Sequence, residues 1–181
     1  MMNNTKVRIA TVSLAGCFGC HMSFLDMDER LVALLEHVEL NRSPLTDIKH
    51  CGQNDIGLIE GGLCNAENVQ VLREFRDNCK ILVAVGACAI NGGIPAMRNH
   101  FSLRECLAES YLDGSGTVNA QIPDDVELPL LLSKVHAVHE VVRIDYYLPG
   151  CPPTADNFLK LLGDLLDGKV PALPKNQLHF D

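Results

Sequence analysis

The sequence predicts an α/β protein with a mostly parallel sheet of four or five strands and helices on both faces. Short apolar or β-rich runs alternate with longer segments whose apolar residues recur at helical spacing. Glycine follows several of the short runs, as expected where a strand ends in a loop. This alternation is typical of a parallel sheet wrapped by helices. The 181 residues are most simply one domain, 1–181, with an extended tail from about residue 169.

The first half of the chain supplies two strands and two helices. Residues 7–12 are β-rich and are followed by Gly16 and Gly19, which predicts the first strand and its loop. Residues 22–38 carry leucines on one face and predict a single helix. Residues 56–59 predict a second strand, and Asn65 is placed to cap a helix over residues 66–78.

The second half continues the alternation. Residues 80–85 are almost wholly apolar, as expected of a strand that is covered on both faces. A helix over residues 102–112 precedes a long Gly-, Pro- and Asp-rich loop over residues 113–129. Residues 138–148 contain another strand-like run, and a last amphipathic helix starts at Thr154 and stops near Gly168.

Four cysteines lie in Gly-rich loops that follow predicted strands: Cys17, Cys20, Cys88 and Cys151. A flavodoxin-like order suits a sheet of this size, and in such sheets ligands bind beyond the carboxyl ends of the strands. We therefore expect the four thiols to meet at one edge. Four thiolates form a soft site that favours an iron–sulfur cluster or zinc.

Composition narrows the setting. The net charge is −8, from 15 basic and 23 acidic residues, and no basic cluster is present, which argues against nucleic acid or an anionic membrane as partner. The N-terminus shows no apolar signal segment or twin arginine, so we expect a cytoplasmic protein. Eight cysteines in that compartment indicate metal or redox chemistry, although Cys79 and Cys106 lie in helical or helix-end patterns that fit small buried apolar residues.

The string Cys17-Phe-Gly-Cys20-His21 has two other interpretations. C-x-x-C-H is the pattern of c-type haem attachment, which requires export, and no export signal is visible. C-x-x-C beside a βα turn also fits a redox dithiol, which leaves Cys88 and Cys151 without a role.

Further candidates lie near the same edge. His136 and His139 have the spacing to complete a Cys2His2 zinc site with the C-x-x-C pair, although zinc fingers are far more compact. Cys64 is a reserve ligand, and Glu60 is either a functional carboxylate that lines a path or carries protons, or a solvated loop acid. The loop over residues 13–16 lies where a flavodoxin holds the FMN phosphate, but it lacks a run of hydroxyl residues, so FMN is the less favoured cofactor.

Taken together and in order, four strings resemble the small subunit of nickel–iron hydrogenases over residues 6–166: Cys17-Phe-Gly-Cys20, Glu60-Gly61, Gly86-Ala-Cys88 and Pro149-Gly-Cys151-Pro-Pro153. The resemblance implies a flavodoxin-like domain that holds the proximal [4Fe–4S] cluster, with the four cysteines named above as its ligands. It also implies that the catalytic nickel–iron centre lies in a separate large subunit, so that this chain has no catalytic residue of its own.

Two departures favour one branch of that family. No cysteine follows Cys151, whereas periplasmic uptake enzymes carry ligands for medial and distal clusters in a further region. The related complex I subunit has adjacent cysteines where this chain has C-x-x-C. The chain is thus most similar to small subunits of soluble, bidirectional NAD-reducing hydrogenases, which implies a diaphorase partner with iron–sulfur clusters and flavin. The alternatives are a small subunit of a sulfhydrogenase-type or other cytoplasmic hydrogenase, and a non-catalytic metal or flavin electron carrier.

Overall fold

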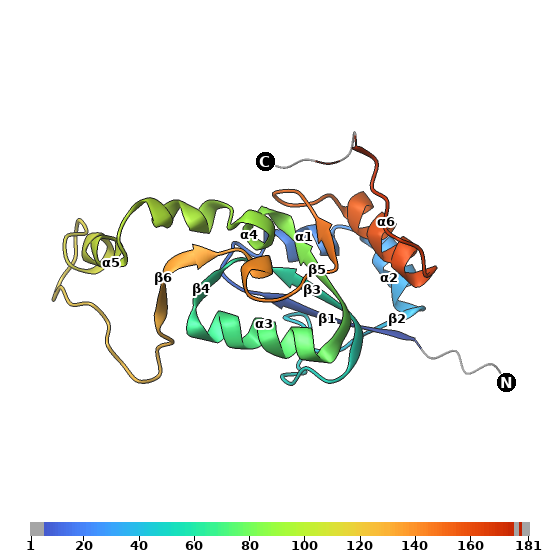
Figure 1. Cartoon of the computed structure of the whole chain (residues 1–181), viewed down its shortest axis with the longest axis horizontal. Helices are drawn as coiled ribbons and strands as arrows, with labels where there is room; N and C mark the ends of the chain where they lie inside the picture. Colours follow the sequence, from blue (N-terminus) through green and yellow to red (C-terminus); the bar gives the residue numbers. More distant parts are fainter. Residues whose placement is uncertain (1–5, 176–177, 179–181) are drawn as a thin grey trace.

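The computed structural model describes residues 6–175 and residue 178. Its central feature is a five-stranded, wholly parallel sheet in the order β2-β1-β3-β5-β7 (Figure 1). Numbered along the chain within this sheet, the order is 2-1-3-4-5, which is the flavodoxin-like order. The predicted fold class is confirmed. The strands are β1 (Val7–Ser13), β2 (Val38–Leu40), β3 (Asn54–Glu60), β5 (Cys79–Val85) and β7 (Tyr146–Leu148).

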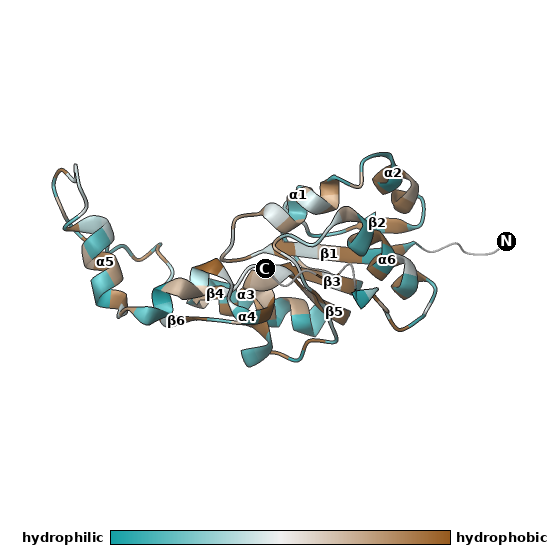
Figure 2. Ribbon diagram, turned by 90° about the horizontal axis from the view of Figure 1, so that it is seen from above, coloured by the Kyte–Doolittle hydropathy of each residue, from teal (hydrophilic) through white to brown (hydrophobic). Residues whose placement is uncertain are grey.

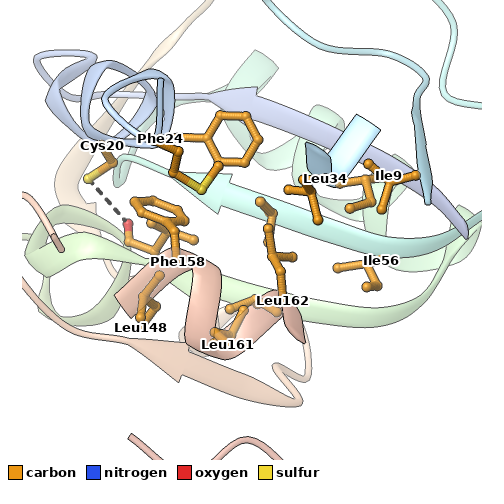
Figure 3. Packing of buried hydrophobic residues seen from close by; sticks show 14 residues of the cluster. Ile9, Cys20, Phe24, Leu34, Ile56, Leu148, Phe158, Leu161 and Leu162 are labelled. Atoms are coloured by element: carbon orange, nitrogen blue, oxygen red, sulfur yellow. Dashed lines mark hydrogen bonds between the residues drawn. The ribbon is translucent and has the colours of Figure 1, made fainter. Parts of the chain in front are cut away.

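Helices cover both faces of the sheet and bury two apolar clusters. On one face lie α1 (Gly19–Leu25), α2 (Glu29–Leu35) and α6 (Ala155–Leu166); on the other lies α3 (Ala66–Asn78). In the first cluster the rings of Phe24 and Phe158 meet edge to face, 5.6 Å apart between centroids (Figure 3). Aromatic residues buried in this way contribute several kcal/mol each, about 3–5 for Phe→Ala. This packing fixes α1 against the sheet.

The prediction of a single helix over residues 22–38 is wrong. The structure divides it into α1 and α2, and Asp28 between them has φ 51, which no helix accommodates. Asp favours caps and turns because its side chain competes for backbone hydrogen bonds. Val38, the last residue of the predicted helix, instead begins the edge strand β2 and is 2% exposed.

A second, two-stranded sheet was not predicted. It pairs β4 (Leu63–Asn65) with β6 (Leu131–His136) in antiparallel fashion. The strand-like run predicted over residues 138–148 is a 3-10 turn, η2 (Val138–Glu140), followed by the short strand β7. The predicted loop over residues 113–129 contains no helix or strand. Part of the tail predicted to be extended lies outside the described residues.

An arm projects from the sheet between Cys88 and β7. It consists of η1 (Ile94–His100), α5 (Leu103–Tyr111), the following loop and β6, and we call residues 94–136 the arm (Figure 2). The arm joins the sheet through α4 (Gly86–Asn91), which directly follows β5. None of the helices in the described part of the chain has the length and apolar character needed to cross a membrane.

Candidate metal centre

Four thiols reach the carboxyl edge of the sheet from three strand ends. Cys17 lies in the loop after β1 and Cys20 in the first turn of α1. Cys88 lies in the first turn of α4, immediately beyond β5, and Cys151 follows β7. All four are free thiols. The strand order places these distant residues at one edge, as the topology of the predicted fold required.

Burial and neighbouring acidic groups act on two of the four thiols, Cys20 and Cys88. Burial raises the pKa of Cys20 well above its ordinary range, and Glu60 and the other three cysteines raise it further. Burial likewise raises the pKa of Cys88, with added contributions from Cys151 and Cys17. A positive charge beside these two thiols, such as a bound metal ion supplies, would favour their thiolate forms.

Exposure differs across the group. Cys20 is buried, its sulfur 3.9 Å from the carbonyl oxygen of Val85 at the end of the first core cluster (Figure 3). Cys88 is half-buried, whereas Cys17 and Cys151 are exposed. The site therefore has a dry side against the core and an open side toward solvent or a partner.

Glycines surround the sulfur atoms where a side chain would not fit. A Cβ on Gly86, which has φ 79, would lie 2.4 Å from the Cys20 sulfur. A Cβ on Gly93, which has φ 49, would lie 2.9 Å from the Cys88 sulfur, and one on Gly19 would lie 3.1 Å from the Cys17 sulfur. This close approach of backbone to sulfur fits an iron–sulfur cluster, whose potential depends on backbone amides nearby.

Glu60 is buried beneath the thiols. Only 3% of it is exposed, so the interpretation as a solvated loop acid is wrong. Its carboxylate accepts hydrogen bonds from the amides of Cys20 (3.3 Å) and His21 (3.1 Å) and from the His21 ring Nδ1. The sequence pattern singled out His21 only as the histidine of C-x-x-C-H, and it did not single out Thr11. The Thr11 hydroxyl lies 2.8 Å from His21 Nε2. The available signal was Thr11 itself, a polar residue between the apolar residues Ala10 and Val12 of β1.

The other candidates have partners elsewhere. The Cys64 thiol donates to Asn68 Oδ1 at 3.3 Å, and His136 Nδ1 lies 2.8 Å from Glu140. Within the described ranges, no three or more His, Cys, Asp or Glu side chains form a compact site for a single ion. A cluster needs wider spacing than one ion, because its irons and sulfides lie between the thiolates. The residues at the sheet edge thus fit a cluster better than a Cys2His2 zinc site.

Cys79 and Cys106 are remote from this edge. Cys79 caps the end of α3 and begins β5, at the end of that strand away from the other thiols, and it is buried as predicted, with 4% exposed. Cys106 lies within α5 on the arm, where its sulfur is 3.9 Å from the Arg98 carbonyl oxygen.

The loop considered for FMN is tied to its neighbours. The amides of Leu14 and Ala15 donate to the carbonyl oxygens of Glu60 (2.8 Å) and Gly62 (3.0 Å). Gly61 has φ 89, and a Cβ there would lie 2.8 Å from the carbonyl carbon of Leu14. These two amides are therefore not directed at a phosphate, and FMN stays the less favoured cofactor.

Fold and site together define a class: a flavodoxin-like α/β subunit with cysteines gathered at the carboxyl edge of its sheet. The family model described as "NADH ubiquinone oxidoreductase, 20 Kd subunit" matches residues 17–165. The chain belongs to this family, and it is of the nickel–iron hydrogenase small-subunit type, as its motifs predicted.

Its relatives are hydrogenase subunits. The NAD-reducing hydrogenase HoxS subunit delta of Cupriavidus necator is 49% identical over 97% of this chain and 86% of its own length. A subunit of the F420-non-reducing hydrogenase of Methanothermobacter marburgensis is 36% identical over 96% of this chain. The chain spans only 58% of the length of that second relative.

Solved structures agree with the fold. A chain in the crystal structure of an NAD+-reducing [NiFe]-hydrogenase in the H2-reduced state is 57% identical, with a TM-score of 0.96 over 98% of this chain and 100% of that one. A [NiFeSe]-hydrogenase chain from Dm. baculatum is 20% identical, with a TM-score of 0.59 over 96% of this chain and 69% of that one. The second match concerns the fold alone.

Proposed function

We propose that this chain is the electron-transfer small subunit of a cytoplasmic, NAD-reducing nickel–iron hydrogenase. In this role it carries electrons between the nickel–iron site of a large subunit and a diaphorase module. The single observation that carries the proposal is the meeting of four thiols from three strand ends at one sheet edge. The likeness to NAD-reducing hydrogenase subunits supports the choice of acceptor.

Cys17, Cys20, Cys88 and Cys151 would hold one proximal [4Fe–4S] cluster. When bound, such a cluster accepts and releases single electrons. Cys20 and Cys88 fix the dry side of the site, and the first turns of α1 and α4 hold their sulfur atoms in place. Cys17 and Cys151 face outward, so the electron path to a partner passes their side of the site.

The large subunit would dock over this open side. Ile94 and Met97 of η1 are 71% and 64% exposed, and η1 follows the helix of Cys88 after only two residues. Apolar side chains exposed this close to the thiols indicate a surface that a protein partner covers. The nickel–iron site belongs to that partner, so the chain alone should not split hydrogen.

NAD itself would bind elsewhere. The first strand is not followed by the G-x-G-x-x-G fingerprint that cradles a dinucleotide. Because this chain would hold only one cluster and NAD would bind elsewhere, electrons need a second cluster-bearing protein to reach NAD. A diaphorase subunit with flavin is suited to this role.

Iron and acid-labile sulfide in the anaerobically purified chain test the cluster. We expect about four of each per chain. Cys88→Ser and Cys151→Ser should lose most of both, whereas the matched controls Cys79→Ser and Cys106→Ser should retain them. One zinc per chain, or covalently bound haem, would contradict the proposal.

Hydrogen-driven NAD reduction tests the relay. The complete complex should reduce NAD, and a complex of only this chain and the large subunit should reduce dyes but not NAD. Full NAD reduction by the two-subunit complex would refute the relay. Reduction of ferredoxin or sulfur in place of NAD would favour a sulfhydrogenase-type subunit.

A further inference from the structure

A continuous chain of buried polar side chains leads from the Cys20 backbone into the protein. Thr11, His21, Ser43 and Glu60 are between 2% and 5% exposed. His21 Nδ1 bonds to the Glu60 carboxylate, and His21 Nε2 lies 2.8 Å from the Thr11 hydroxyl. The Thr11 hydroxyl in turn lies 2.7 Å from the hydroxyl of Ser43. Buried polar groups are costly unless they are fully satisfied, so a network of this length needs a reason.

Every group in this network has a partner when His21 is neutral with its proton on Nδ1. The ring then donates to Glu60, and Nε2 accepts from the Thr11 hydroxyl. Thr11 accepts from Ser43, whose oxygen also accepts from the Leu45 amide at 3.2 Å. The network thus ties the start of α1 to β1, to the end of β3 and to the loop after β2.

The Glu60 carboxylate accepts from two backbone amides in the first turn of α1. It accepts from the backbone of Cys20 at 3.3 Å and of His21 at 3.1 Å. These N–H groups are the backbone donors at, and next to, a proposed ligand. Because they point at a carboxylate, they are not free to donate to a cluster sulfur.

The ring of His21 also packs against Phe18, one of the two residues between Cys17 and Cys20. Phe18 has φ 68, a left-handed conformation that costs a bulky residue about 1–3 kcal/mol. Its ring stacks on the His21 ring with a centroid distance of 4.7 Å and an interplanar angle of 7°. The stack helps to hold Phe18 in this conformation and thereby sets the path of the chain from Cys17 to Cys20.

We propose that Glu60 and His21 are positioning residues that keep the Cys20 amide off the cluster and so hold its reduction potential low. The inference rests on the proposed [4Fe–4S] cluster. Amide donors to cluster sulfur stabilise the reduced, more negative state and raise the potential, so withholding them has the opposite effect. Thr11 contributes by fixing the ring of His21.

Redox titration of the anaerobically purified full chain, followed by electron paramagnetic resonance, tests this role. Glu60→Gln replaces two carboxylate acceptors by one amide oxygen and should release a backbone N–H. We expect its midpoint potential to shift to less negative values. Thr11→Val removes the hydroxyl from the His21 ring and should shift the potential in the same direction by a smaller amount. Thr11→Ser keeps the hydroxyl, so this variant should have the parental midpoint potential.

The outcomes separate the inference from the function that it rests on. A parent chain without iron and sulfide would overturn both. A Glu60→Gln chain that holds the cluster at the parental potential would overturn the positioning role alone. If Glu60→Gln loses the cluster, the two Thr11 variants provide the test. Equal midpoint potentials for Thr11→Val and Thr11→Ser would reject the positioning role. A shift in Thr11→Val alone would support it.

Discussion

Backbone without side chains lies against three of the four sulfur atoms at the sheet edge, and Gly86 is the most constrained case. Its φ of 79 is one that residues with a Cβ rarely adopt, and its Cβ position is 2.4 Å from the Cys20 sulfur. The Cys20 thiol cannot retreat, because the core of α1 and α6 packs behind it. Glycine at position 86 therefore allows the backbone turn that follows β5 and also leaves room for the Cys20 thiol.

Gly86→Ala should lower the free energy of unfolding by roughly 1–3 kcal/mol, through backbone strain and displacement of the Cys20 side chain. It should also lower the iron content of the purified chain. Urea unfolding and metal analysis measure the two effects. Gly163→Ala is the matched control: it lies in α6 with ordinary φ and nothing within 4 Å of its Cβ, and we expect a gain of about 0.5–1 kcal/mol. Equal effects at both sites would contradict the argument.

At the scale of elements, Asp145 ties three segments together just before β7. Its Oδ2 accepts from the Leu82 amide in β5 at 2.8 Å and from Arg76 at the end of α3 at 2.7 Å. Burial alone would raise the pKa of Asp145, but the hydrogen bonds from Arg76 and Leu82 outweigh it and hold this pKa below the ordinary 3.8. The ionised carboxylate therefore stabilises the fold.

Asp145→Asn should cost roughly 1–3 kcal/mol of unfolding free energy at pH 7, as for hydrogen bonds to a charged group. Since the folded pKa is the lower one, this stabilisation is complete above the ordinary pKa and is lost as pH falls through the folded value. The difference between parent and variant should thus shrink below about pH 4. Urea titrations between pH 7 and pH 3.5 measure it. Asp156→Asn breaks a pair with Arg30 whose side chains are mostly exposed and should cost under about 1 kcal/mol. A pH-independent difference at Asp145 would exclude the charge as its cause.

The local signals in the sequence predicted those elements whose ends are fixed locally. Asn65 accepts from the Asn68 amide at 2.8 Å, Thr154 caps α6, and Gly168 has φ 69 just past its end. Such caps depend on residues three or four positions apart, so they can be predicted from the local sequence.

Pairing between segments that are distant in the sequence could not be predicted from local signals. β2 and β7 are only three residues long and are strands because β1 and β5 lie beside them. The pair β4–β6 joins segments more than sixty residues apart. The burial of Glu60 has the same origin, since it follows from the register Ser13–Glu60 between β1 and β3. The four thiols were predicted because a general rule of strand topology, and no particular contact, brings them to one edge.

At the scale of the whole molecule, apolar exposure is unevenly distributed. Of the sixteen large apolar side chains exposed among the described residues, eleven lie between residues 94 and 131 on the arm. This surface begins close to Cys88 along the chain, because η1 follows α4 after two residues. A second copy is a poor occupant, since each chain carries a net charge of −8 and copies repel one another. The large hydrogenase subunit, which the proposed function places over the thiols, is the partner that would meet both surfaces.

Met97→Glu should weaken association with the large subunit by ten-fold or more, because a charge buried against an apolar partner costs about 2 kcal/mol or more. The fraction of large subunit that copurifies with the chain, and the hydrogen-dependent dye reduction of the complex, measure the loss. Iron and sulfide per chain should stay at the parental level, since Met97 is 64% exposed and does not support the thiols. Val32→Glu is the matched control, because Val32 is 67% exposed on α2, away from the arm, and should leave association unchanged. An intact complex with Met97→Glu, or equal loss with Val32→Glu, would place the large subunit on another face and leave the arm to the electron-accepting partner.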